Sequence, residues 1–380
     1  MFNVVARSNL AYDRVRLLIG TIGVAFAVLL AFINLGFSGA LSETAALLYN
    51  NLDAKVYLIS PLSVYGNATE AFPQERLYQA AAHPDVAQAV PLYQGFARWR
   101  NAETDQEFFI LGYGFNPLDR PFTLPAVQST EAIATLKQAN TVLLDRNSLP
   151  KYGPQQVGLS TEFNRQSVKV GGLFSLGGGM STEGTILMSD QNFQRYYGLE
   201  NLDKVDLGLL RLLPDANPQA VAAALRQVLP ADVAVYTRAE MIERDRQYWF
   251  KTTAVGFIFN LGVGVALIVG AATVYQILYA DISKNFKEYA TLKAIGFRNR
   301  FLLNVVLQEA VLLALIGFVP GLILSLLSYQ IITVWTGGAI PMLMPIGRVF
   351  LVCGLTVVIC VLSGLLSIRK IVSADPAGVL

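Results

Sequence analysis

The sequence predicts a membrane protein in which four transmembrane helices accompany one large α/β domain outside the membrane. Three observations support this fold class. The 380 residues are 53% hydrophobic and only 15% charged, whereas soluble domains carry about 25% charged residues. The apolar residues gather into four long runs, and about 20 such residues suffice to cross a bilayer. Residues 38–251, of ordinary composition, separate the first run from the second.

The four apolar runs define the predicted spans. Leu17–Phe37, Thr252–Leu278 and Val349–Ile368 hold no charged residue, and Phe301–Tyr329 is broken only by Glu309. The first run exceeds the 7–15 apolar residues of a secretory signal, and no clear cleavage site follows it, so we interpret it as an uncleaved anchor. The spans are predicted at 17–37, 252–278, 301–329 and 347–368.

Basic residues predict the orientation, because short cytoplasmic segments carry an excess of Lys and Arg. This rule places the amphipathic segment 1–16, the loop 279–300 and the tail 369–380 in the cytoplasm. The domain 38–251 and the hairpin 330–346 then lie outside. The charges agree, since residues 40–250 hold 17 basic and 22 acidic residues, and the remainder holds 12 and 5.

Segment 38–251 has the mixed pattern of a folded α/β domain. Two flanks, Ser42–Leu52 and Thr237–Phe250, are expected to continue the first and second membrane helices into a rigid stalk; ordinary surface helices are the alternative. Strands are expected at Val56–Ile59, Ala97–Asn101, Gln106–Leu111, Thr141–Leu144, Ser167–Phe174, Gly184–Met188, Val205–Leu212 and Val233–Tyr236. Helices are expected at Pro73–Ala82, at Ser129–Gln138 and from Asn217-Pro218 to before Pro230.

The composition offers little for catalysis. Two cysteines and one histidine cannot build a Cys₂His₂ or His₃ metal site, and His83 stands outside any metalloprotease motif. The chain holds no G-x-x-x-x-G-K-[ST] phosphate loop. We therefore predict a non-enzymatic chain with no catalytic residue, metal or cofactor of its own. The weak net charge of +2 does not indicate a nucleic-acid partner.

Two features lie inside the predicted spans. Glu309 is an acid in a membrane helix, where ionisable residues are candidates for function; a hydrogen-bonded or paired structural role and proton coupling are both open. Small residues recur every fourth position and allow helix backbones to approach closely, within one chain or across a dimer. The packing positions are Gly262, Ala266 and Gly270 in the second span, and Gly317 and Gly321 in the third.

The cytoplasmic loop predicts a short amphipathic helix that ends at a glycine. Two interpretations are open. The helix lies passively on the membrane surface, or it is a docking site for a cytoplasmic partner. The residues that we assign to this coupling helix are Lys284, Phe286, Lys287, Glu288, Tyr289, Leu292, Lys293, Ile295 and Gly296.

The stretch K-E-Y-A-T-L-K-A-I-G at 287–296 resembles the loop of the FtsX/MacB superfamily of ABC-transporter permeases. Gln308-Glu309-Ala310, Gly317-x-x-Pro-Gly321 and the tail segment 374–380, A-D-P-A-G-V-L, extend the resemblance. With the head segments A-F-A at 25–27 and G-F-S-G-A-L at 36–41, the chain looks most like the DevC branch, cyanobacterial glycolipid-exporter permeases. The wider family often has a basic residue and Arg before the loop glutamate, where Phe286-Lys287 stand here.

This resemblance implies a MacB-like architecture in the inner (plasma) membrane, with both termini cytoplasmic and the large domain periplasmic. It implies a homodimer whose loop 284–296 docks a separate ABC ATPase, which would hold ATP and Mg²⁺. It also implies a DevB-like periplasmic membrane-fusion adaptor, a TolC-like outer-membrane channel and lipid or glycolipid cargo. Force from ATP hydrolysis would pass through the stalk, a process called mechanotransmission.

Other functions fit parts of this pattern. A lipoprotein-releasing or hydrolase-activating permease of the same superfamily would have the same layout with another periplasmic partner. A membrane-anchored sensor would bind a ligand in its outer domain, but sensors usually carry a larger cytoplasmic output module than loop 279–300 provides. An intramembrane enzyme would need a catalytic pair in the spans, and Glu309 alone does not supply one.

Overall fold

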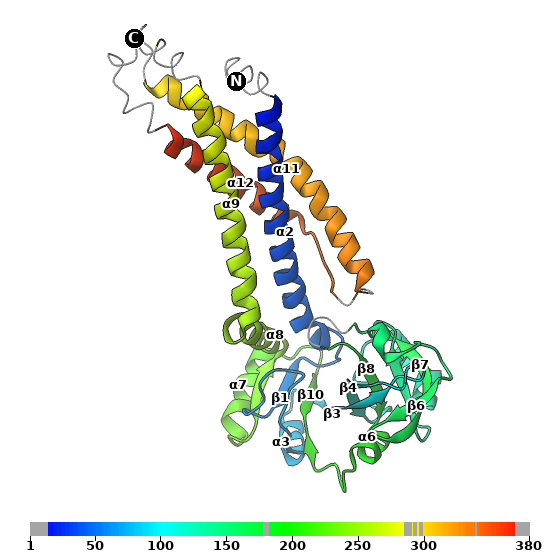
Figure 1. The fold of residues 1–380 in the computed structure, drawn as a ribbon. Helices are drawn as coiled ribbons and strands as arrows, with labels where there is room; N and C mark the ends of the chain where they lie inside the picture. Colours follow the sequence, from blue (N-terminus) through cyan, green and yellow to red (C-terminus); the bar gives the residue numbers. More distant parts are fainter. Residues whose placement is uncertain are drawn as a thin grey trace. The chain divides into compact units, whose positions relative to one another are not determined.

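The computed structural model describes residues 14–177, 182–284, 291, 295, 299–336, 338 and 340–368 (Figure 1). They form two compact units. The helical unit contains the chain up to Gly39, Val255–Ile332 and the chain from Met342, and the α/β unit contains Ala40–Ala254 with Thr333–Pro341. This division confirms the predicted fold class, membrane helices together with one large α/β domain.

In the described part of the chain, four helices are long and apolar enough to cross a membrane. Each overlaps one predicted span, so the prediction of four membrane-spanning helices is confirmed. They are α2 (Arg14–Asn50), α9 (Ala254–Lys284), α11 (Asn299–Trp335) and α12 (Ile346–Ser367). α2 has 37 residues, more than a bilayer needs, and its residues from Ala40 belong to the α/β unit.

The α/β unit is built on a nine-stranded mixed sheet with the order β11-β1-β10-β3-β4-β8-β5-β7-β6. Strand β3 holds its two halves together, because Val86–Leu92 pairs with β10 and Tyr93–Arg100 pairs with β4. The strands are β1 Val56–Ile59, β2 Phe72–Pro73, β3 Val86–Arg100, β4 Glu107–Phe115, β5 Thr141–Asp145, β6 Ser160–Phe163, β7 Gln166–Phe174, β8 Thr185–Ser189, β9 Lys204–Val205, β10 Leu207–Leu212 and β11 Ala234–Thr237. β2 and β9 form a separate pair.

Both faces of the large sheet are buried. Successive side chains of a strand point to opposite faces, and in β1 Val56 and Leu58 join one apolar core while Tyr57 and Ile59 join the other. The first core also receives α3 and α7, and the second receives the end of α2 together with α5 and α8. The helices are α3 Glu75–Ala81, α4 Pro125–Gln128, α5 Thr130–Leu136, α6 Asp190–Tyr197, α7 Pro218–Val228 and α8 Arg238–Gln247, with short turns at Pro150–Tyr152 and Tyr248–Thr252.

The expected elements are largely present, with two corrections. Pro73 does not open a helix; it pairs with Lys204 in the β2–β9 ladder, and α3 begins at Glu75. The expected single strand 205–212 is two strands separated at Asp206, whose carboxylate accepts hydrogen bonds from the Gln94 N–H at 2.9 Å and the Thr69 hydroxyl at 3.3 Å. These contacts come from distant parts of the sequence. Strand Val56–Ile59 and helix Pro218–Val228 are confirmed.

Candidate functional site

The C-terminal end of α2 is embedded in the core of the α/β unit. Tyr49 is 1% exposed and Leu52, two residues past the helix end, is fully buried. The side-chain amide of Asn51 donates to the Leu47 carbonyl at 2.9 Å and satisfies one of the carbonyls that a helix end leaves open. The last turn of α2 is therefore fixed to the sheet by apolar packing as well as by polar contacts.

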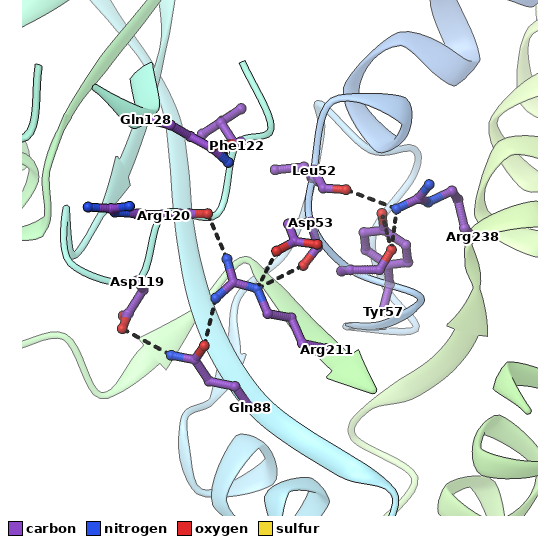
Figure 2. Close-up of polar contacts among 11 residues, drawn as sticks. Leu52, Asp53, Tyr57, Gln88, Asp119, Arg120, Phe122, Gln128, Arg211 and Arg238 are labelled. Atoms are coloured by element: carbon purple, nitrogen blue, oxygen red, sulfur yellow. Dashed lines mark hydrogen bonds and ion pairs between the residues drawn. The ribbon is translucent and has the colours of Figure 1, made fainter. Parts of the chain in front are cut away.

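An arginine from α8 holds the chain that leaves α2 (Figure 2). The Arg238 guanidinium donates to the carbonyls of Leu52 at 3.0 Å and Ala54 at 2.5 Å, and its backbone N–H donates to the Lys55 carbonyl at 3.0 Å. The Tyr57 hydroxyl donates to the Tyr49 carbonyl at 3.2 Å. Hydrogen bonds from a charged donor are the stronger kind, so this segment has little freedom.

A second arginine, Arg211 on β10, holds the same segment from another side (Figure 2). Its guanidinium pairs with the Asp53 carboxylate at 2.8 Å and donates to the Gln88 side-chain oxygen and the Arg120 carbonyl, both at 2.6 Å. The Gln88 amide in turn donates to Asp119 at 3.2 Å. Arg211 thus connects the end of α2 to β3 and to the loop after β4.

Local sequence explains why α8 begins where it does. Thr237 and Glu240 form a capping box, in which the Thr237 hydroxyl accepts from the Glu240 N–H and the Glu240 carboxylate accepts from the Thr237 N–H. Residues three and four apart then share one helix face. Arg238, Met241 and Asp245 follow this spacing, and Met241 is fully buried in the core that also contains Tyr49 and Leu52.

The same face of α8 also makes a hydrogen bond to a side chain of α2 itself. The Tyr49 hydroxyl donates to the Asp245 carboxylate at 2.8 Å, and the Gly66 N–H donates to it at 3.0 Å. Two polar contacts, at Arg238 and at Asp245, therefore flank the buried Met241. We call Tyr49, Leu52, Arg238, Met241 and Asp245 the α2–α8 junction. It joins the segments that lead out of the first membrane helix and into the second.

The connection from α8 to α9 is helical but interrupted. Residues Tyr248–Thr252 form a π-helical turn, and Thr253 is extended with φ −96° and ψ 155° before α9 begins at Ala254. Single π-helical turns are frequent at functional sites. The sequence suggests a continuous lead into the second span, whereas the structure has a joint at Thr253. In α2, by contrast, the helix runs unbroken to Asn50.

Burial raises the pKa of Asp245 and of Asp206 above the ordinary range of a carboxyl group. Burial raises the pKa of Asp245 to about 6, although hydrogen bonds from Tyr49 and Gly66 and the nearby Arg244 oppose the shift. Burial likewise raises the pKa of Asp206 to about 6, against the bonds from Gln94 and Thr69. In both side chains the folded structure therefore destabilises the charged carboxylate relative to the neutral acid.

These shifts predict a pH dependence of stability. An acid whose folded pKa lies above its unfolded value of about 3.9 contributes stability that is fully present below pH 4 and is lost as pH rises through 6. The free energy of unfolding should fall between about pH 4 and 6, and less steeply in Asp206→Asn/Asp245→Asn. Chemical denaturation of the parent chain and of this double variant, at fixed ionic strength, measures the difference. Parallel pH profiles of the two would contradict the assignment of the pH dependence to Asp206 and Asp245.

Most of the expected coupling helix lies outside the described residues, namely Phe286, Lys287, Glu288, Tyr289, Leu292, Lys293 and Gly296. Lys284 is the last residue of α9. The Ile295 N–H donates to the Thr291 carbonyl at 3.0 Å, the bond between residues four apart that characterises an α-helix. Ile295 is 71% exposed. Docking on this loop stays a prediction.

The structure buries Glu309 within α11, where it is 2% exposed. A second acid, Asp281 near the end of α9, is equally buried at 1%. Asp281 was not predicted as a candidate because it lies just past the apolar run that ends at Leu278. Its position as the first charged residue after that run is the signal that could have identified it. A hydrogen-bonded structural role for Glu309 and its proton coupling both stay predictions.

The small residues of both faces lie against α2 in the helical unit. A Cβ atom added to Gly317 would lie 2.5 Å from the Val24 Cβ, and one added to Gly321 would lie 2.8 Å from the Ala25 carbonyl oxygen. On α9, a Cβ atom added to Gly262 would lie 2.1 Å from the Asn34 side chain, and one added to Gly270 would lie 3.0 Å from the Ala27 Cβ. Ala266, between them, is fully buried. The four glycines therefore lie at close contacts with α2 of the same chain.

Comparisons with known proteins agree with this architecture. Residues 17–228 match the family described as MacB-like periplasmic core domain, and residues 260–376 match the FtsX-like permease C-terminal family. The macrolide export ATP-binding/permease protein MacB of Bordetella avium (strain 197N) is 30% identical over 132 residues, 34% of this chain. The match spans 20% of that protein's length.

Two solved structures match part of the chain at low identity. The periplasmic region of MacB from Actinobacillus actinomycetemcomitans has a TM-score of 0.37 and 11% identity, covering 51% of this chain and 92% of that one. The extracellular domain of the ABC-type transporter YknZ from Gram-positive bacteria has a TM-score of 0.33 and 11% identity, covering 48% of this chain and 100% of that one.

Proposed function

The chain belongs to the MacB/FtsX superfamily of ABC-transporter permeases, and on this premise we propose that it transmits force rather than forming a pore. A separate ABC ATPase, holding ATP and Mg²⁺, would dock on loop 284–296 in the cytoplasm. Its closure would move the membrane helices of a homodimer. The α/β unit, as the periplasmic domain, would pass that movement to a membrane-fusion adaptor and an outer-membrane channel.

The observation that carries this proposal is the α2–α8 junction. The segments joining the α/β unit to the first and second membrane helices are bonded to each other through Tyr49–Asp245 and through Arg238. Both also pack into one core beneath the sheet. A displacement of the end of α2 or of α8 must then displace the sheet, because close-packed interiors transmit strain.

The cargo assignment is narrower and rests on sequence. We propose lipid or glycolipid export with a DevB-like adaptor and a TolC-like channel, on the DevC-like features of the loop 287–296, the tail 374–380 and the head segments 25–27 and 36–41. A tagged full-length chain pulled down from native membranes, with lipidomics of a deletion strain, tests this assignment. Unchanged lipid composition in the deletion strain would contradict it.

Docking is tested by changing the loop. Lys287→Glu together with Gly296→Pro should reverse a charge and misplace the end of the coupling helix, and so should reduce the ABC ATPase recovered with the tagged chain at least tenfold, equivalent to about 1.4 kcal/mol of binding free energy. Mass spectrometry of complexes from native membranes measures recovery at equal expression. Arg369→Glu is the charge-reversal control. An ATPase that still binds and is still stimulated would refute the docking assignment.

A further inference from the structure

The loop between β1 and β2 presents apolar side chains to the outside of the α/β unit. Leu62 is 78% exposed and Val64 is 52% exposed. The ten residues from Ser60 to Thr69 carry no charge. Surface loops are normally polar. Single exposed apolar residues are common, but here two lie on one uncharged loop tip.

The loop is held firmly, so this exposure does not reflect a loose segment. The Arg244 guanidinium donates to the Ser63 carbonyl, and the Ser63 hydroxyl accepts from the Glu70 N–H at 2.9 Å. The Gly66 N–H donates to Asp245, and the Gly66 carbonyl accepts from the Gln94 amide at 2.9 Å. The backbone on both sides of Val64 is thus fixed, which fixes the direction of its side chain.

The loop tip touches the aromatic residues that precede the second membrane helix. The Tyr65 ring stacks on Tyr248 at 4.9 Å between centroids and meets Trp249 edge-on at 5.3 Å. Tyr and Trp concentrate at membrane–water interfaces. Trp249 lies five residues before Ala254, where α9 begins. Five residues of chain span at most about 18 Å, so Trp249 lies within that distance of the start of α9.

We propose that the loop tip Pro61–Tyr65 lies in the headgroup layer of the outer leaflet and inserts Leu62 and Val64 among the lipids. The partner is the phospholipid interface, because the tip is continuous with the aromatic residues at the start of a span and brings no charge that insertion would have to desolvate. Each inserted side chain removes apolar surface from water. Since Arg244 and Asp245 hold the loop, the contact anchors α8 to the membrane surface.

Depth-dependent fluorescence quenching tests this contact on the full chain. In a Cys353→Ala/Cys360→Ala background, Leu62→Cys carries an environment-sensitive fluorophore. The protein is reconstituted in phosphatidylcholine–phosphatidylglycerol vesicles containing lipids spin-labelled at the headgroup or on the acyl chain. Tyr78→Cys is the control, since Tyr78 is 68% exposed and α3 packs into the core on the other face of the sheet from α8.

Headgroup and shallow-chain spin labels should quench the Leu62 probe at least twofold more than the Tyr78 probe, with Val64→Cys behaving like Leu62→Cys. Equal quenching at Leu62 and Tyr78, or quenching of Leu62 by a water-soluble agent alone, would overturn the proposal. The vesicles contain no ATPase and no ATP. Failure of the proposed force transmission therefore leaves this result unchanged, and the two ideas fail separately.

Discussion

Replacing Asp245 with leucine is expected to lower the free energy of unfolding of the α/β unit by about 2–4 kcal/mol. The leucine fills the space but leaves the Tyr49 hydroxyl and the Gly66 N–H without the acceptor that they have at 2.8 and 3.0 Å. A buried donor left without an acceptor costs about 1–3 kcal/mol. Loss of the unfavourable burial of the carboxylate offsets part of this cost.

Asp245→Asn is the matched control for this variant. Its side-chain oxygen can still accept from Gly66, and its amide can donate to the Tyr49 hydroxyl, which is able to accept. We expect hydrogen exchange to accelerate in peptides covering 44–57 and 238–249 in Asp245→Leu, and to change little in Asp245→Asn. Peptides of β5 and β7 should be unaffected in both. Equal exchange in the two variants would mean that the carboxylate does not hold the junction.

Parts of the α/β fold follow from rules that act over a few residues. Thr237 and Glu240 mark the start of a helix because the capping box is local, and Asn217-Pro218 does the same for α7, where the Asn217 side chain accepts from the Gln219 N–H at 2.9 Å. Strand β1 is recognisable from four consecutive apolar residues. The order of nine strands is not recognisable, because each pairing depends on partners far away in sequence.

The site was predictable in outline. Two helical flanks were expected to join the outer domain to the membrane, and the structure has helices in both. The pairing of Tyr49 with Asp245, 196 residues apart, leaves no signal in either segment, and neither does the hold of Arg238 on the Leu52 carbonyl. The spacing of small residues likewise predicts close helix packing but does not identify the partner helix. In the structure the partner is α2, on which both α9 and α11 pack.

The second large effect is expected in the helical unit. Gly321→Leu places a side chain where a Cβ alone would lie 2.8 Å from the Ala25 carbonyl and from the Val28 Cβ. Neither neighbour is the flexible end of a side chain, so α11 must move away from α2. Inserting bulk into a close-packed contact costs about 1–3 kcal/mol and occasionally more, and we expect the upper end here.

Gly264→Leu is the matched control, because a Cβ at this position on α9 meets nothing within 4 Å among the described residues. Heating detergent-extracted protein and measuring the monodisperse fraction by size exclusion should show Gly321→Leu aggregating at a temperature at least several degrees lower, with Gly264→Leu close to the parent. Because α2 ends in the junction, a displaced α11 should also weaken the proposed force transmission, seen as reduced stimulation of the proposed ATPase partner. Equal thermal profiles for the two variants would show that the α2–α11 contact is not the close approach described.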